Sequence, residues 1–321
     1  MKNFLSKIKT ERVYVFLILL FGMISVFVTF PLGNGDEGYH LSKSYNIFSM
    51  NHPKSMKKTV VRQLEYQAIG LDGDMKDFDV ETFYIKKLKD VEKDSFRFNI
   101  AYDRNITMQI DIAHIPAAIG VMVGRVIYPS YGIMLLCSRI SSLLFFALCM
   151  GAIIKKSTVG KWTLFMLFSI PCIQKLASPS YDVFSYVVFA MYSMNIFELA
   201  KLRTIKEISK QKILYTLITI ILLLFCKKNY LFALAVIPFL PMFFLRILEW
   251  LDNKKMSVKI VTFVTGIIVM LVLLVGLNYY LNLFSLFKAF MKSYFNMATM
   301  GDRGKFLFSV VPTILPEIFN L

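Results

Sequence analysis

Cysteine is scarce in this sequence, and its distribution argues against a disulfide framework. None of the cysteines lies in the polar segment Gly33–Met108, where an oxidising compartment would make a bridge useful. All of them fall in or at the ends of apolar runs, at Cys137, Cys149, Cys172 and Cys226. We therefore interpret them as small apolar residues.

Acidic residues are also few. The chain holds 21 Asp and Glu against 37 Lys and Arg, a formal net charge of +16. A basic chain can bind nucleic acid, but no basic stripe here interleaves with exposed aromatic residues. The basic residues lie instead in short segments between apolar runs, as membrane topology requires. We therefore expect no nucleic-acid partner.

Hydrophobic residues, by contrast, make up 56% of the 321 residues, more than a soluble domain can bury. The composition predicts an all-α, polytopic transmembrane helical bundle in contact with membrane lipids. Residues 13–32 form the first span, because about twenty apolar residues cross a bilayer. Four basic residues precede this span, and short basic flanks stay inside. We therefore expect a cytoplasmic amino terminus.

The long segment 33–130 then lies outside and is expected to hold helices that rest in the membrane interface. Ile110–Ile127 is apolar enough to be mistaken for a span. Its apolar residues follow helical spacing on one face, whereas Asp111, His114 and Arg125 share another. If this helix does not cross, the basic clusters 155–161 and 201–212 lie on the cytoplasmic side.

The whole chain, residues 1–321, is interpreted as one transmembrane domain. Residues 131–281 hold six further spans, 282–304 form an outer loop, and 305–321 begin another span. The six spans are Tyr131–Ile154, Trp162–Ala177, Tyr181–Ala200, Ile213–Cys226, Tyr230–Leu248 and Val258–Leu281. The chain ends before the last span clears the membrane, so we expect it to be part of a longer protein.

The first candidate site follows the first span directly, in Gly35-Asp36-Glu37-Gly38-Tyr39-His40. If a helix begins here, Asp36 and His40 lie one turn apart on the same face. One interpretation is an acidic helix start that the helix dipole favours. The other is a carboxylate base at the boundary of water and lipid, where partial desolvation raises its pKa.

Two further motifs are expected at outer ends of spans. Asp182 either caps the helix that follows it or acts as a second acidic group. Lys227 and Lys228 place two cations outside, against the usual charge bias. They either reach lipid headgroups or form a phosphate clamp, which Arg139 could join.

A metal site is a further alternative. Asp36 with His40, and Asp111 with His114, could supply carboxylate and imidazole ligands to a divalent ion. Neither pair has a recognised metal spacing. We therefore expect no metal and no cofactor.

Several short motifs, taken in order, resemble the bacterial membrane family known as domain-of-unknown-function family 2142. The resemblance covers nearly the whole chain. It rests on Asp36-Glu37-x-x-His40, Ile115-Pro116-Ala117-Ala118-Ile119-Gly120, Arg139, Ser178-x-Ser180-Tyr181-Asp182 and Lys227-Lys228-x-Tyr230. Members of this family commonly have proline before the Asp-Glu pair, where this chain has Gly35. The freer backbone of glycine puts the pose of the two carboxylates in doubt.

That family is in turn similar to the GT-C superfamily of membrane glycosyltransferases, which take sugars from polyprenyl-phosphate carriers. The resemblance implies a multi-pass protein of the bacterial plasma membrane that transfers a sugar to a cell-envelope glycan or lipid acceptor. It implies catalytic roles for Asp36, Glu37 and Asp182. It also implies substrate binding by His40, Arg139, Ser180, Tyr181, Lys227, Lys228 and Tyr230.

Three function classes stay open at this point. A glycosyltransferase needs a base and a cationic clamp on the same side of the membrane, and the expected topology places both outside. A transporter for cell-envelope polysaccharide would more naturally hold ionisable groups near the middle of the bilayer. A non-catalytic assembly partner would not depend on Asp36, Glu37 or Asp182.

Overall fold

The computed structural model describes residues 9–70, 78–98, 112–158, 170–226, 228–243, 245, 250 and 255–281. All secondary structure in these residues is helical, which confirms the predicted all-α class. The chain divides into two compact units, Met1–Arg246 and Ile247–Leu321. The second unit contributes α14, Met256–Leu281, where a span was predicted. The predicted start of a further span, 305–321, lies outside the described residues.

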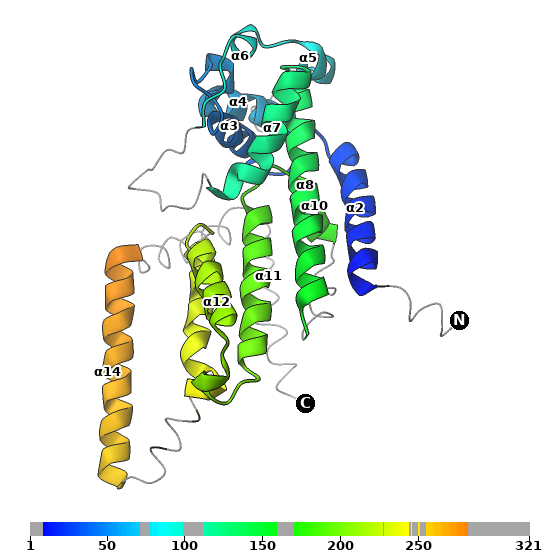
Figure 1. Cartoon of the computed structure of the whole chain (residues 1–321). Helices are drawn as coiled ribbons and strands as arrows, with labels where there is room; N and C mark the ends of the chain where they lie inside the picture. The colour runs from blue at the N-terminus through cyan, green and yellow to red at the C-terminus, as the bar shows by residue number, and fades with distance from the viewer. Residues whose placement is uncertain are drawn as a thin grey trace, which may run out of the picture. The chain divides into compact units, whose positions relative to one another are not determined.

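Helices α2, Thr10–Val28, and α8, Tyr131–Lys156, form the framework of the first unit and pack side by side (Figure 1). They match the first two predicted spans. Within the described ranges they are the two helices long and apolar enough to cross a membrane. The predicted total of seven spans therefore stays a prediction.

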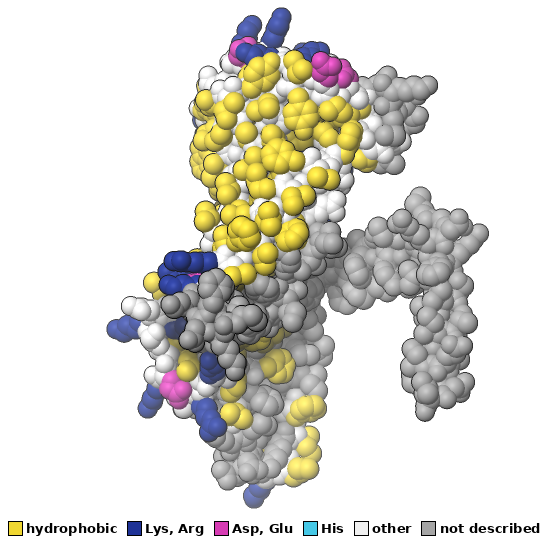
Figure 2. Space-filling model, turned by 90° about the vertical axis from the view of Figure 1, so that its right-hand side faces the viewer, with side chains coloured by type: hydrophobic (Ala, Val, Ile, Leu, Met, Phe, Trp, Pro, Cys, Tyr) yellow, Lys and Arg dark blue, Asp and Glu magenta, His cyan; other side chains and the backbone are white. Residues whose placement is uncertain are grey.

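One face of α2 packs against protein and the other is an apolar surface. Tyr14, Ile18, Gly22 and Val26 recur every four residues and are buried. Gly22 has no room for a side chain, because Leu143 of α8 occupies the place of its Cβ. The opposite face exposes Phe16, Leu20, Phe21, Ile24, Phe27 and Val28. Figure 2 shows this side of the molecule as an apolar band between charged ends, as expected of a surface that lipid covers.

The segment between α2 and α8 folds into a group of short helices at the end where α8 begins, and we call this group the cap (Figure 1). The helices of the cap enclose a small apolar core, to which Leu41, Phe83 and Val121 contribute together with Met134 of α8. The cap consists of α3 (Glu37–Asn46), η1 (Lys54–Met56), α4 (Lys58–Ala68), α5 (Val80–Ile85), α6 (Lys89–Glu92), η3 (Ile112–His114) and α7 (Ile115–Ile127).

The predicted interface helix is present as η3 and α7, and both of its ends contact other parts of the cap. His114 at its start bonds to α3, and Pro129 beyond its end accepts a hydrogen bond from the Leu88 amide. Its apolar face is exposed, as predicted. Its polar face was expected to meet water, but His114 and Arg125 are buried in the protein instead. Periodicity identified the two faces but not what covers the polar one.

Helix α7 approaches the first turns of α8 very closely. A Cβ on Gly124 would lie 2.8 Å from Met134 Cα, and Gly120 meets the backbone at Cys137 and Ser138 in the same way. Two small residues four positions apart allow such close backbone contact between apolar helices. This packing fixes the cap to the framework.

The remaining helices of the first unit agree with the predicted spans to different degrees. Helix α11 matches its prediction within one residue. Helix α12 has 14 residues, fewer than a bilayer needs, and η5 is a 3-10 helix. The first half of the predicted span Trp162–Ala177 lies outside the described residues, and its second half contains α10. The bounds are α10 (Ile170–Leu176), α11 (Asp182–Leu199), η4 (Ile205–Glu207), α12 (Lys210–Leu223) and η5 (Lys228–Phe239).

Basic residues gather where α8 ends, away from the cap, and we call this the basic end. The Lys201 ammonium, after α11, donates to Thr158 just beyond α8 at 3.2 Å. The Lys212 ammonium of α12 lies 2.5 Å from the carboxylate of Glu198 on α11. The end of α8, the end of α11 and the start of α12 therefore meet, so these clusters, which were predicted to share one membrane side, lie at one end of the first unit.

Candidate functional site

The turn after α2 holds Asp36 in an unusual backbone conformation. Leu32, Gly35 and Asp36 all have positive φ, at 60°, 57° and 55°. Asp tolerates this left-handed region better than most residues, and non-glycine outliers of this kind cluster at functional sites. Asp36 precedes the first residue of α3, yet its side chain does not cap the helix. Its carboxylate is 65% exposed and forms an ion pair with Arg62 of α4.

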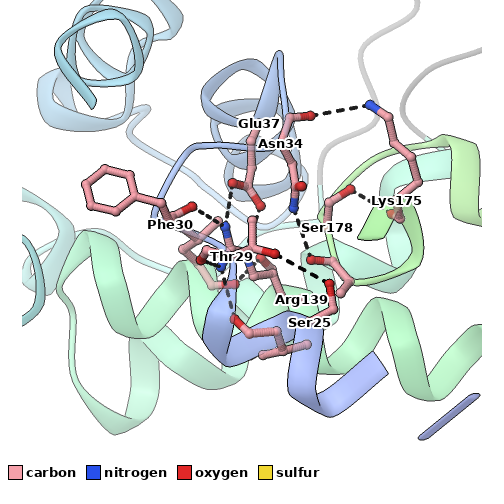
Figure 3. A network of polar contacts seen from close by, with 12 residues as sticks. Ser25, Thr29, Phe30, Asn34, Glu37, Arg139, Lys175 and Ser178 are labelled. Atoms are coloured by element: carbon pink, nitrogen blue, oxygen red, sulfur yellow. Dashed lines mark hydrogen bonds and ion pairs between the residues drawn. The ribbon is translucent and has the colours of Figure 1, made fainter. Parts of the chain in front are cut away.

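Glu37, the neighbouring acidic residue, points the other way, into the protein. Its carboxylate accepts hydrogen bonds of 2.8 and 2.7 Å from the Arg139 guanidinium of α8. Arg139 also donates to the carbonyl oxygens of Val26, Thr29 and Phe30 at the end of α2 (Figure 3). These contacts use all five of its N–H groups. Both side chains are 1% exposed, so the pair joins α2, α3 and α8 and has no surface to offer a substrate.

Glu65 of α4 lies beside Asp36 and was not predicted from the sequence. It is 2% exposed, and its carboxylate approaches the first amides of α3, where Gly38 leaves space. Its Oε2 lies 3.9 Å from the Nε of Arg62, so Arg62 contacts both acidic residues. Burial raises the pKa of Glu65, and the charge of Asp36 raises it further. The sequence carries one signal: Glu65 shares the apolar face of its helix with Val61 and Ala68.

Two histidines far apart in the sequence meet under this turn. His40 Nδ1 and His114 Nε2 lie 2.8 Å apart, and both residues are buried. In such a pair one nitrogen must donate and the other accept, so the two rings share a proton between these atoms. Tyr181, from the turn before α11, contacts both rings edge-on, with centroids 4.8 and 5.4 Å away. The structure thus brings together three residues that the sequence identified separately.

Asp182 begins α11 directly after Tyr181 and is buried at 8% exposure. Its amide donates to the Ser180 hydroxyl at 3.1 Å, so Ser180 shapes the start of the helix. Asp36, His40, Tyr181 and Asp182 therefore lie at the cap end of the first unit, as the sequence predicted for one face of the membrane.

Lys175 is a second residue that sequence reasoning missed. Its ammonium donates to the Asn34 carbonyl at 3.3 Å, and the Asn34 amide donates to the Ala177 carbonyl at 3.4 Å (Figure 3). These bonds tie the turn that carries Asp36 to the end of α10. They also bring a second cation to the turn, at Asn34, two residues before Asp36. Lys175 gave no signal because it stands alone within an apolar run.

The predicted lysine clamp is only partly described. Lys227 lies outside the described residues, and for Lys228 the structure gives the backbone alone, as the first residue of η5. Cys226, directly before Lys227, is within hydrogen-bonding reach of Ser185, one turn from Asp182. Tyr230 packs against Phe189, with ring centroids 5.2 Å apart, two turns from Asp182. Tyr230 is thus further from the histidine pair than Tyr181 is.

No group of three His, Cys, Asp or Glu side chains in the described ranges is arranged to hold a metal ion. Asp111, which was paired with His114 in one sequence interpretation, lies outside those ranges. One ring nitrogen of His40 is hydrogen-bonded to one ring nitrogen of His114. The described side chains of the site are carboxylates, imidazoles and cations.

One comparison with known proteins gives a match. A family model described as "Predicted membrane protein (DUF2142)" matches residues 19–300. The matched region contains every site residue named above. No curated protein and no solved structure matches the chain.

Proposed function

The chain belongs to the DUF2142 family of predicted membrane proteins, and we propose that it transfers a sugar from a polyprenyl-phosphate carrier to a cell-envelope glycan or lipid acceptor. The observation that carries this proposal is the exposed Asp36 carboxylate, in a left-handed turn at the end of α2, paired with Arg62 and with Lys175 bound to the carbonyl of Asn34 in the same turn. A sugar transfer of this kind needs a base for the acceptor hydroxyl and positive charge for the departing phosphate.

The membrane side of the site follows from charge. Arg12 of α2 lies close to Lys155 of α8, and Lys201 and Lys212 lie at the same end. Basic residues favour the cytoplasmic side. The cap and Asp36 then lie on the outer face of a bacterial plasma membrane, where carriers loaded with sugar would be used.

Asp36 is the better candidate for the base, and Glu37 has a positioning role. Both Glu37 oxygens are bound to Arg139, whereas Asp36 is exposed and contacts a partly exposed arginine, Arg62. Asp182 is the second acidic group, and the pair of His40 and His114 can hold a proton nearby. The carboxylate of Asp36 accepts the proton of the acceptor hydroxyl as that oxygen attacks the sugar.

The phosphate of the donor requires cations that can reach it. Arg139 is unsuitable, because each of its N–H groups is already bound in the protein. Arg62 forms an ion pair with Asp36, and Lys175 contacts Asn34 in the same turn. Lys227 and Lys228 remain part of the proposal, since the residue before them lies near the start of α11. Charge-assisted hydrogen bonds from such groups stabilise the leaving phosphate.

Product formation from a panel of polyprenyl-phosphate sugars, with purified protein in lipid nanodiscs, tests the proposal. Asp36→Asn is expected to lower turnover by about 100-fold or more, as is typical when a general base is removed. Glu81→Gln, an exposed acidic residue of the cap, is the matched control and should retain activity. Full activity in Asp36→Asn would exclude it as the base. No product from any donor with the wild-type protein would contradict the transferase proposal itself.

A further inference from the structure

A second site lies at the basic end of the first unit, away from the cap. A cavity of about 490 Å³ opens between the end of α8, the last turns of α11 and the start of α12. This volume is in the range of small-molecule sites in proteins. Its inner wall is mostly apolar and includes Cys149, Ala152, Met191 and Met194.

A buried polar atom in the wall lacks a partner. The side chain of Asn195 is 2% exposed and lines the cavity. Its amide nitrogen donates to the Thr216 hydroxyl at 2.8 Å, but its carbonyl oxygen has no hydrogen-bond partner among the described residues. Buried acceptors are nearly always satisfied, so this oxygen is available to accept a hydrogen bond from a molecule in the cavity.

The mouth of the cavity is positively charged. Lys156 is exposed there, and the carboxylate of Glu198 is neutralised by Lys212. Glu198 is the single acidic residue of the lining. An occupant with a negative group at the mouth and an apolar part in the interior is therefore favoured.

We propose that this cavity binds an anionic phospholipid of the membrane leaflet at the basic end. The phosphate lies near Lys156, a headgroup hydroxyl or amine donates to the Asn195 carbonyl oxygen, and acyl carbon atoms contact Met191 and Met194. The cavity lies between helices of a protein that spans the membrane, and lipid is the abundant apolar molecule around such helices. Its occupancy does not depend on the proposed sugar transfer.

Protection of a native cysteine tests the inference in the wild-type protein. Phosphatidylglycerol, added to the protein in a neutral detergent, is expected to slow labelling of Cys149 by a small thiol reagent. Cys137 lies on the same helix outside the cavity and is the internal control, with each cysteine quantified by mass spectrometry of its peptide. Equal protection by phosphatidylcholine would overturn the proposal, because the cavity would then bind lipid without selecting its charge. Protection by inorganic phosphate alone would also overturn it, because the ligand would then be a free anion.

Variants test the same contacts independently. Lys156→Glu is expected to weaken protection by phosphatidylglycerol about tenfold, and Ala152→Trp to abolish it by filling the cavity. Lys86→Glu, an exposed lysine of the cap, is the matched control. An equal effect of Lys86→Glu, or none from Lys156→Glu, would overturn the site. Should a variant fail to fold, the wild-type comparison of lipids still decides the question.

Discussion

Arg139 and Glu37 lie 102 positions apart in the sequence and form a buried ion pair with two hydrogen bonds. The same guanidinium binds three carbonyl oxygens at the end of α2, where the helix dipole is negative. All five N–H groups of Arg139 are therefore hydrogen-bonded. A buried ion pair offsets the free-energy cost of its desolvation only when its remaining hydrogen-bonding groups are satisfied in this way. The pair holds Asp36 in place, since Asp36 precedes Glu37 directly.

Removing one partner of this pair should destabilise the protein severely. Arg139→Ala leaves the carboxylate of Glu37 buried without a partner, which typically costs about 3–5 kcal/mol. Glu37→Gln should cost less, because the amide can still accept a hydrogen bond from Arg139. The measurement is thermal unfolding in nanodiscs, with Arg97→Ala, an exposed arginine of the cap segment, as control. An unchanged melting temperature in Arg139→Ala would show that the pair is dispensable.

The membrane orientation gives a second prediction. A cysteine introduced at Lys206 should be protected from an impermeant thiol reagent in intact cells, because the basic end is expected in the cytoplasm. A cysteine introduced at Glu81, which is exposed in the cap, should react. The native cysteines, labelled in the unsubstituted protein, give the background. Strong labelling at Lys206→Cys would reverse the topology and remove the site from the outer face.

Helical periodicity was sufficient to predict much of this architecture. It located α2, α8 and α11 closely, and it predicted that α7 has one apolar and one polar face. It could not show that Arg125 would turn inward, because a pattern shows which residues share a face and not what that face meets. Arg125 donates to the carbonyls of Phe48 and Asp94, which lie in segments brought close only by folding.

The candidate site was predictable only in part, for the same reason. Asp36, His40 and Asp182 stood out because they border apolar runs. The pairing of His40 with His114 depends on contact between α3 and η3, which no local pattern specifies. Arg139 was predicted to join a phosphate clamp, but its N–H groups bind Glu37 and the carbonyls at the end of α2. Its partner could not be identified, because an isolated arginine is compatible with either a phosphate or a buried carboxylate.

Asp94 should make the cap sensitive to acid. Burial alone would raise its pKa, but hydrogen bonds from Ser49, Tyr45 and the Asn51 amide, with the charge of Arg125, lower it below the ordinary value. A lowered pKa means that its stabilisation is present above the ordinary value of 3.8 and is lost as the pH falls through the folded-state pKa.

Replacing Asp94 should therefore remove that acid sensitivity. Asp94→Asn is expected to lower the free energy of unfolding near neutral pH by roughly 1–3 kcal/mol, because buried donors lose an ionised acceptor. The difference from the wild-type protein should shrink in acid. Unfolding followed by tryptophan fluorescence measures both effects. The series runs from about pH 3 to about pH 7, a range that includes the ordinary carboxyl pKa. A constant difference at every pH would contradict the prediction.

Glu65 should show the opposite dependence. Burial, and then the charge of Asp36, raise its pKa above the ordinary value of 4.5 despite the helix amides and Arg62. The folded protein therefore holds this proton more tightly than the unfolded chain, so Glu65 lowers stability as the pH rises from the ordinary value through the raised one. At neutral pH the buried negative charge of Glu65 lowers the free energy of unfolding. In acid the carboxylate is protonated and this penalty is absent.

Glu65→Gln should consequently stabilise the protein near neutral pH and have little effect in acid, because the amide keeps the shape of the protonated carboxyl without its charge. The same fluorescence series, run beside Asp94→Asn, provides the comparison. Glu81→Gln is the control for a carboxyl that is exposed. Loss of stability in Glu65→Gln at neutral pH would mean that the α3 amides and Arg62 favour the carboxylate more than burial opposes it, and would place a permanent negative charge beside Asp36.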